Sequence, residues 1–330
     1  MTGRKGPGQG RGGRAAAGRK GSSPASPGRG SASRGSSGGR GGTKGAPRGG
    51  VGGGAARTGR VSRGQGTAGA GTPRRSPGKS LGGEQVEGRQ AVRELLIAQA
   101  RRTYEIWLAS DLQEGDSVED IVALAGANRV PISWVARKRL EAEARSEAPQ
   151  GVLAKAAPLV ETEFSAFLRR RPGHAPFLVA VDGVTDPGNL GAIIRSCDGA
   201  GANGVIVPRH RAVHVTPTVA KAAAGAVEHV PIALVSGLPT ALGQLRDAGI
   251  WVIGLDDAAD RSLFEIGELA NEGVCLVLGA EGAGLSRLVR ERCDMIVSIP
   301  MLGRLSSLNV SAAATLATYE ISRLRAFGHQ

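Results

Sequence analysis

The sequence predicts an α/β fold in which helices cover both faces of a parallel sheet, with a smaller α/β module and a basic tail in front of it. Three observations predict this order. From residue 177 onward, short runs rich in β-branched residues alternate with helical patterns, as is typical of parallel strands joined by helices. Apolar residues at helical spacing first appear just after Glu84. Before Glu84 the chain contains no acidic and no aromatic residue.

The tail, residues 1–83, is basic and rich in glycine. It holds 17 of the 42 Lys and Arg residues and 29 of the 52 Gly residues. Such a segment buries too little apolar surface to offset its backbone entropy, so we expect it to be disordered. The tail carries a charge of +17, and the remaining 25 basic and 29 acidic residues give −4, which together make the net +13. Dispersed arginines can attract RNA phosphates, although a tail that only aids solubility is the alternative.

The cysteines and the hydropathy pattern exclude several classes of protein. Cys197, Cys275 and Cys293 show no paired spacing, so neither a zinc site nor a disulfide framework is predicted. No apolar run reaches the roughly 18 to 20 residues that span a bilayer, and the N-terminus lacks the apolar stretch of a secretory signal. We therefore expect a soluble, cytoplasmic protein with no membrane partner.

The smaller module is predicted over residues 84–157. Its expected elements are helical spacing over residues 87–96, a strand over 104–109, and helices over 118–127 and 134–144. The stretch from Pro149 to Pro176 reads as a connection that contains one short helix over residues 164–168. Within it we place a linker at 158–175, and the larger domain follows over residues 176–330.

The larger domain contains six apolar runs of strand length, which we expect to form its parallel sheet. An alanine-rich helix follows the last of them and ends near residue 325, with its apolar part over residues 312–324. The six predicted strands are residues 177–181, 205–207, 230–235, 251–255, 274–278 and 295–299.

The first motif that could carry chemistry covers residues 182–197, directly after a predicted strand. Its residues 186–188, Asp-Pro-Gly, are a turn signal, Asn189 can cap a helix, and Arg195 lies one to two turns into that helix. Both side chains are expected near the same strand end, where open α/β sheets bind ligands. The structural alternatives are a plain helix cap for Asn189 and a solvent-facing position for Arg195.

The second motif covers residues 278–285 and reads as a strand, a glycine-rich turn and a helix. Gly279, Gly282 and Gly284 let the backbone approach a ligand, but they do not form the dinucleotide pattern G-x-G-x-x-G. Glu281, in the middle of the turn, would repel a pyrophosphate. A cofactor without phosphates therefore fits better, and the alternative is a simple turn in which Glu281 favours the helix dipole.

The third motif covers residues 299–311, directly before the final helix. Ser307, Asn309 and Ser311 cluster at the start of that helix. Hydroxyl and amide side chains commonly cap helices, so capping alone is the structural alternative. Sequence spacing does not bring the three motifs together.

The three motifs, in this order over about 150 residues, resemble those of the SpoU branch of SPOUT methyltransferases. Residues 87–158 also resemble the N-terminal RNA-binding module of the bacterial 23S rRNA guanosine 2'-O-methyltransferases of this branch, which is similar to ribosomal protein L30e. One departure is Pro149, because relatives usually have His before the Gln-Gly pair at 150–151.

This resemblance implies a fold that pattern reasoning does not propose. The C-terminal segment would thread through a loop and form a trefoil knot, a rare exception among folds. The crossings would build the pocket for the cofactor, S-adenosyl-L-methionine. The residues expected to bind it are Gly279, Ile299, Leu308, Leu278 and Met301.

The implied reaction is attack of an RNA ribose 2'-oxygen on the sulfonium methyl, without a metal. Arg195 would orient a phosphate or the 2'-oxygen and stabilise developing negative charge, since arginine holds its proton too tightly to be a ready base. Glu281 would fix Arg195 or contact the substrate. The resemblance also implies a homodimer. The residues expected to act in catalysis are Arg195, Asn189, Glu281, Asn309 and Ser307.

Three other functions stay open at this point. A SpoU enzyme could act on tRNA or on another rRNA site. A nucleotide-binding oxidoreductase would share the sheet and the glycine-rich turn, but the fingerprint is imperfect and Asp294 precedes a strand where that class has an acidic residue after one. A non-catalytic RNA-binding protein would keep its activity after Arg195→Ala.

Overall fold

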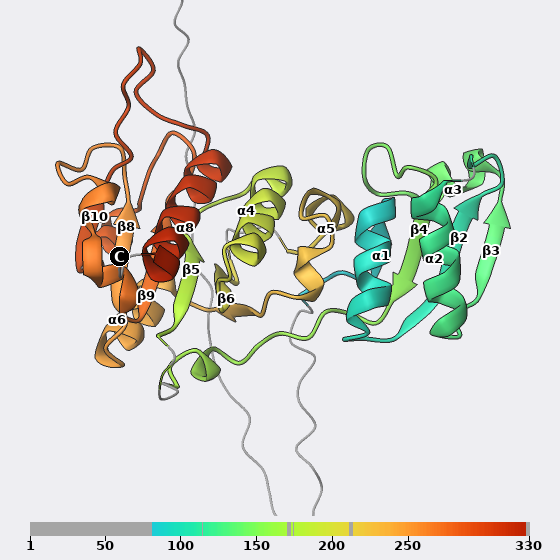
Figure 1. The fold of residues 1–330 in the computed structure, drawn as a ribbon, viewed down its shortest axis with the longest axis horizontal. Helices are drawn as coiled ribbons and strands as arrows, with labels where there is room; N and C mark the ends of the chain where they lie inside the picture. The colour runs from blue at the N-terminus through green and yellow to red at the C-terminus, as the bar shows by residue number, and fades with distance from the viewer. Residues whose placement is uncertain (1–80, 114, 170–172, 174, 211–213, 328–330) are drawn as a thin grey trace, which may run out of the picture. The chain divides into compact units, whose positions relative to one another are not determined.

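The structure is a computed structural model, and the first residues it describes already belong to the fold. It describes residues 81–327 apart from 114, 170–172, 174 and 211–213 (Figure 1). Most of the predicted tail lies outside these ranges, but its last three residues are packed. Leu81 is 3% exposed in the core of the larger domain, and the backbone of Gly82 bridges Val215. Residues 81–83 therefore differ from the predicted disorder.

The smaller module is a four-stranded mixed sheet with three helices. The strand order is β1-β4-β2-β3, where β4 is antiparallel to both its neighbours and β2 is parallel to β3. One apolar core lies between the sheet and the first two helices. The elements are β1 (Gln85–Glu87), α1 (Arg89–Ala98), β2 (Thr103–Ala109), α2 (Asp116–Ala127), β3 (Ile132–Val135), α3 (Arg137–Glu143) and β4 (Val152–Ala156).

Two predictions for this module are wrong. The helix predicted over residues 134–144 begins only at Arg137, because Trp134 belongs to the edge strand β3, where it pairs with Leu108. The stretch from Pro149 also contains a strand, β4, which lies between β1 and β2. Strand β4 lacks the alternation of apolar and polar residues that marks a half-buried strand, since nearly all its residues are buried. Strand β1 is only three residues long, and its two polar residues, Gln85 and Glu87, are buried.

The larger domain has a six-stranded sheet in which every pair of neighbours is parallel, as predicted. The strand order is β10-β8-β9-β5-β6-β7. The elements are η1 (Phe164–Ala166), β5 (Phe177–Val181), α4 (Pro187–Gly199), β6 (Gly204–Pro208), α5 (Pro217–Ala222), η2 (Ala226–Glu228), β7 (Ile232–Val235), α6 (Leu238–Asp247), β8 (Trp251–Leu255), η3 (Leu263–Glu265), η4 (Gly267–Asn271), β9 (Val274–Leu278), α7 (Arg287–Arg290), β10 (Met295–Val297) and α8 (Val310–Phe327).

Helices cover this sheet on both faces. Alternate residues of the central strand β5 point to opposite sides: Phe177 packs in the core formed with α4, α5 and α8, and Leu178 packs in the core formed with α6 and α7. Every residue of β5 and of β9 is buried. A strand buried on both faces is a continuous apolar run, which is why the predicted bounds of these two strands match the structure.

Close helix packing holds α4 in place beside the sheet. At Gly191 an added Cβ would lie 2.6 Å from both the Cβ of Ala222 and the carbonyl oxygen of Val219 on α5. On another side, the hydroxyl of Ser196 lies 2.7 Å from that of Thr315 on α8, and Figure 1 shows α8 beside α4. Helix α4 is therefore held against both α5 and α8.

Two expectations from composition concern cysteines and membranes. Cys197 and Cys275 are buried, Cys293 is partly buried, and all three are free thiols. Burial raises the pKa of the Cys197 thiol to about 12. None of the helices in the described ranges is long and apolar enough to cross a bilayer.

Candidate active site

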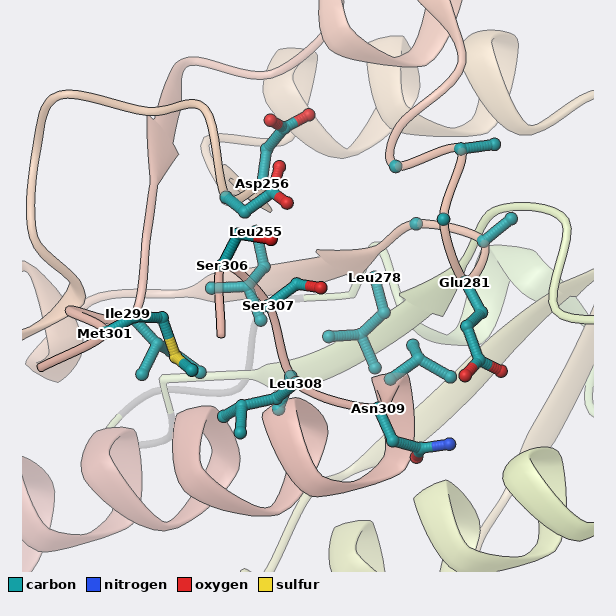
Figure 2. Close-up of a pocket in the computed structure, with 18 residues that line it drawn as sticks. Leu255, Asp256, Leu278, Glu281, Ile299, Met301, Ser306, Ser307, Leu308 and Asn309 are labelled. Carbon is teal, nitrogen blue, oxygen red and sulfur yellow. The ribbon is translucent and has the colours of Figure 1, made fainter. Parts of the chain in front are cut away.

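A cavity of about 450 Å³ opens at the carboxyl ends of β8 and β9. Its walls come from the glycine-rich turn at 279–284, from residues 299 and 301, and from residues 306–310 (Figure 2). Parallel strands collect their carboxyl ends at one edge of a sheet, and ligands bind there. All five residues predicted to bind the cofactor line this cavity: Leu278, Gly279, Ile299, Met301 and Leu308.

Glycine at 279 lets the turn fold tightly. The backbones of Ala280 and Gly284 exchange two hydrogen bonds, at 3.0 and 2.9 Å. An added Cβ on Gly279 would lie 2.3 Å from the carbonyl carbon of Gly284. Gly282 and Gly284 have φ of +74° and +63°, a region that side chains disfavour. The backbone of the turn can therefore border the cavity directly.

The three motifs meet at the rim of this cavity through a chain of hydrogen bonds. Asn189 Nδ2 donates to Glu281 Oε2 at 3.2 Å, and Asn309 Nδ2 donates to Asn189 Oδ1 at 3.1 Å. Glu281 and Asn309 also line the cavity. The expectation that Asn189 caps its helix is wrong, because Asp186 is the cap and its carboxylate accepts the backbone N–H of Asn189 at 2.6 Å. The Asn189 amide is thus free to join the other two motifs.

In the third motif, Asn309 both caps a helix and takes part in the site. Asn309 Oδ1 accepts the backbone N–H of Ser311 at 2.8 Å and its hydroxyl at 2.6 Å, which is the geometry of a helix cap. The amide nitrogen of the same side chain reaches Asn189. Capping therefore orients Asn309 toward the site. Ser307 lines the cavity without belonging to this hydrogen-bonded chain.

Arg195 is the predicted site residue that the structure keeps apart from the cavity. It lies on α4, is exposed, and is absent from the cavity lining. Arg195 comes six positions after Asn189, which rotates the two side chains by about 240° relative to each other around the helix axis. Among the described residues the Arg195 guanidinium has no hydrogen bond or ion pair. It is thus open to a ligand that comes from solvent.

Sequence reasoning missed the acidic residues after β8. Leu255, Asp256 and Asp257 line the cavity, and Asp256 Oδ2 accepts a hydrogen bond from Arg290 Nη1 at 2.6 Å. The rule that polar residues after parallel strands gather at one edge could have found them, because the strand 251–255 was predicted. What was not predicted is that β8 lies next to β9.

The lining of the cavity indicates which cofactor it can take. Its volume lies within the range of about 300–1,000 Å³ that small-ligand pockets have. Among the described residues that line it, none is basic, whereas Asp256, Asp257 and Glu281 are acidic. Such a site disfavours phosphate and suits a cationic ligand. The apolar floor and the open backbone of the turn suit a flat, neutral base. S-adenosylmethionine combines these properties, so the residues fit it.

The parallel sheet and the acidic pocket at its edge fit an α/β protein that binds a cationic nucleoside ligand. Comparison with known proteins gives the family. Residues 176–319 match the model of the SpoU rRNA Methylase family, and residues 85–161 match the model described as RNA 2'-O ribose methyltransferase substrate binding. The chain belongs to the SpoU rRNA methylase family.

Relatives with known assignments match most of the chain. RlmB of Pseudomonas aeruginosa, a 23S rRNA (guanosine-2'-O-)-methyltransferase, is 40% identical over 73% of this chain and 97% of its own length. YacO of Bacillus subtilis, assigned to the TrmH family of tRNA/rRNA methyltransferases, is 37% identical over 73% of this chain and 96% of its own length.

Solved structures of the family agree in fold. The SpoU methyltransferase AviRb from Streptomyces viridochromogenes, in complex with AdoMet, is 28% identical with a TM-score of 0.61, over 74% of this chain and 91% of its own. An AdoMet-bound rRNA methyltransferase from Sinorhizobium meliloti is 26% identical with a TM-score of 0.59, over 72% and 86% of the two chains. The protein is an S-adenosylmethionine-dependent RNA 2'-O-ribose methyltransferase, which sets the oxidoreductase hypothesis aside.

Proposed function

We propose that this enzyme methylates the ribose of a guanosine in the peptidyl-transferase region of 23S rRNA. Two observations support this target. The module at residues 85–161 matches the substrate-binding model. The RlmB relatives from Pseudomonas align over 97% of their own length, so the alignment includes this module. A tRNA or another rRNA site is the alternative, because YacO and similar relatives are assigned more broadly to tRNA and rRNA.

The residues around the cavity would divide the work of the reaction. Bound S-adenosylmethionine supplies a methyl group on a positively charged sulfur, which is an activated leaving group. Leu278, Ile299 and Leu308 provide the apolar surface against which it is held. The acidic Glu281, with its side chain fixed by Asn189, would lie where the RNA ribose meets the donor. The fixed amides hold this geometry in register, which is how positioning accelerates a displacement.

Arg195 would act from outside the cavity. Its exposed guanidinium, without a partner among the described residues, can bind a phosphate next to the target ribose. A bound phosphate would set the distance between the 2'-oxygen and the donor. A role as general base is disfavoured, because arginine holds its proton tightly.

The observation that carries the proposed arrangement of the site is the hydrogen-bonded chain from Asn309 through Asn189 to Glu281 beside an acidic pocket. The 23S rRNA target rests on the substrate-binding match and on the RlmB relatives. The test is methyl transfer in vitro to 23S rRNA fragments and to tRNA, with the product mapped by mass spectrometry. We expect one ribose-methylated guanosine in 23S rRNA. Methylation of tRNA alone would overturn the target. Arg195→Ala should abolish transfer while S-adenosylmethionine binding persists, and Arg195→Lys should recover part of it.

A homodimer is part of the same proposal. Leu316 and Tyr319 on α8 are 47% and 50% exposed, and Leu302 and Leu305 beside the cavity are 98% and 76% exposed. Large apolar side chains exposed together mark interaction surfaces. Light scattering after gel filtration should give twice the mass of the chain, and Leu316→Glu with Tyr319→Glu should give the monomer. A wild-type monomer would contradict this part.

The basic tail and the compartment complete the proposal. Residues 1–80 lie outside the described part of the chain, and their 17 basic residues would attract RNA by phosphate contacts. Deletion of residues 1–80 should raise the KM for RNA most at low salt and leave kcat unchanged. We place the enzyme in the cytoplasm, where its RNA would be found. The trefoil knot and the likeness of the module to L30e stay predictions.

A further inference from the structure

The pocket contains one carboxylate to which the reaction above assigns no role. Asp256 follows the last residue of β8 and lines the cavity, with 8% of its side chain exposed. Figure 2 shows Asp256 away from Glu281 and Asn309, the two residues at the rim where RNA would arrive. A group bound at Asp256 would therefore be a part of the cofactor remote from the transferred methyl.

Several contacts fix this carboxylate. Its Oδ2 accepts from Arg290 Nη1 at 2.6 Å, and its Oδ1 accepts the backbone N–H of Ala258 at 3.0 Å. The backbone N–H of Asp256 donates to Val297 on β10 at 3.0 Å. The turn approaches closely, since an added Cβ on Gly284 would lie 3.3 Å from Oδ2. The acceptor is thus preorganised before any ligand binds.

The pair formed by Asp256 and Arg290 is neutral as a unit, unlike the other acids of the pocket. Each carboxylate oxygen of Asp256 accepts one hydrogen bond among the described residues and keeps a free lone pair, whereas Arg290 itself does not line the cavity. Asp257 and Glu281 also line the cavity but carry no ion pair among the described residues. A carboxylate whose charge is compensated by an arginine suits hydroxyl donors, whereas the unpaired acids suit a cation.

From these contacts we propose that Asp256, supported by Arg290, binds the ribose diol of the cofactor's adenosine. A vicinal diol offers two O–H donors, which match the free lone pairs on the two carboxylate oxygens of Asp256. This inference rests on the proposed use of S-adenosylmethionine. It makes Asp256 a residue that selects ribonucleoside donors over deoxyribose analogues, and it makes Arg290 a positioning residue that acts through Asp256.

The test is calorimetric binding of S-adenosylhomocysteine and of its 2'-deoxy and 3'-deoxy analogues. Loss of a hydrogen bond to a charged group costs about 1.5–3 kcal/mol, so Asp256→Asn should weaken binding of S-adenosylhomocysteine by roughly tenfold to a hundredfold. The wild type should bind at least one deoxy analogue more weakly by a similar factor. Asp256→Asn should lose nothing further with that analogue, because the two changes remove the same contact.

Two matched variants accompany this measurement. Asp260→Asn changes an exposed acid in the same loop that does not line the cavity, and should keep wild-type affinity for all three ligands. Arg290→Gln keeps the Asp256 carboxylate but removes the ion pair that fixes it. It should weaken binding of S-adenosylhomocysteine more than binding of the deoxy analogue. Thermal unfolding of each variant reports whether the fold is kept. If Asp256→Asn does not fold, the comparison of Arg290→Gln with the wild type decides.

Three results would overturn the inference. The wild type could bind both deoxy analogues as tightly as S-adenosylhomocysteine. Asp256→Asn could weaken the binding of every ligand by the same factor. The loss of affinity in Asp256→Asn could also vanish with methylthioadenosine, which lacks the amino acid. Asp256 would then contact the ammonium group. A wild type that binds none of these ligands would instead contradict the proposed function itself.

Discussion

Asn189 donates a hydrogen bond to Glu281 across 92 positions of sequence, at 3.2 Å. Asn189→Asp keeps the shape of the side chain but turns its donor atom into a second carboxylate oxygen facing Glu281. Repulsion between the two carboxylates and the lost hydrogen bond should cost about 1.5–3 kcal/mol in the transition state. We expect kcat for methyl transfer to fall roughly tenfold to a hundredfold, with S-adenosylmethionine binding little changed in calorimetry.

The control for this change lies on the same helix. Ser196→Ala removes the hydroxyl that faces Thr315 but leaves Asn189, Glu281 and Asn309 untouched. It should keep wild-type kcat. Equal losses in the two variants would mean that α4 acts only as a structural support, and that the contact between Asn189 and Glu281 has no part in the reaction.

Gly279→Ala tests the turn that borders the cavity. The new Cβ would lie 2.3 Å from the carbonyl carbon of Gly284 and 2.6 Å from the backbone nitrogen of Leu285, so the turn would have to open. Overpacking of this kind costs about 1–3 kcal/mol. Because the displaced backbone lines the pocket, we expect S-adenosylmethionine to bind roughly tenfold to a hundredfold more weakly in calorimetry.

Gly303→Ala is the matched control for the turn. Gly303 lies in the loop before α8, and an added Cβ there would meet nothing within 4 Å. Its backbone needs no positive φ. Binding should equal that of the wild type. If Gly303→Ala also binds S-adenosylmethionine weakly, the loop at residues 302–308 tolerates no change. The loss in Gly279→Ala would then not be specific to the turn.

Much of the larger domain could be predicted because its strands are buried on both faces. The predicted bounds of β5, β8 and β9 match the structure, since each is a continuous apolar run. The module was harder. Trp134 fits a helical pattern in the sequence, and only its pairing with Leu108 of β2, a long-range contact, makes it part of a strand.

Site residues that belong to a recognisable motif could be predicted from the sequence. Residues whose place in the site depends on which strands are neighbours could not. The five residues predicted to bind the cofactor could be named because their segments resemble known motifs, and all five line the cavity. That they bind the cofactor stays a prediction. Asp256 has no such signal, and its place depends on β8 lying beside β9. Arg195 was predicted to lie in the site but does not line the cavity. Sequence distance places it near Asn189, but the helical rotation between them turns its side chain away from the cavity.

The buried thiols predict a pH dependence of stability. Burial raises the pKa of Cys197 and of Cys293 to about 12, and raises that of Cys275 further. The folded thiols stay protonated while unfolded thiols ionise near pH 8.5, so their stabilising contribution is full below that pH and is lost as pH rises toward 12. At pH 10 the loss is about 2 kcal/mol for each thiol.

Urea unfolding at pH 8 and pH 10 measures this loss. Lysine and tyrosine also titrate in this window, so the informative quantity is the difference between the wild type and Cys197→Ala. The variant lacks one buried thiol and should lose less stability between the two pH values. Identical losses in both proteins would show that the Cys197 thiol ionises as readily in the folded state as in the unfolded state.

Gly191→Ala should separate stability from chemistry. The added Cβ would meet Ala222 and the carbonyl oxygen of Val219, each at 2.6 Å, so α4 and α5 could no longer approach as closely. We expect a loss of about 1–3 kcal/mol in thermal unfolding. Gly243→Ala, on α6, places its Cβ no nearer than 4.0 Å to Arg292 and should gain about 0.5–1 kcal/mol from helix propensity. Asn189 also lies on α4. If α4 and α5 move as one body in Gly191→Ala, methyl transfer should fall only in proportion to the unfolded fraction of the variant. A larger loss of activity, measured well below the unfolding temperature, would show that the spacing of α4 and α5 sets the position of Asn189 at the rim of the pocket.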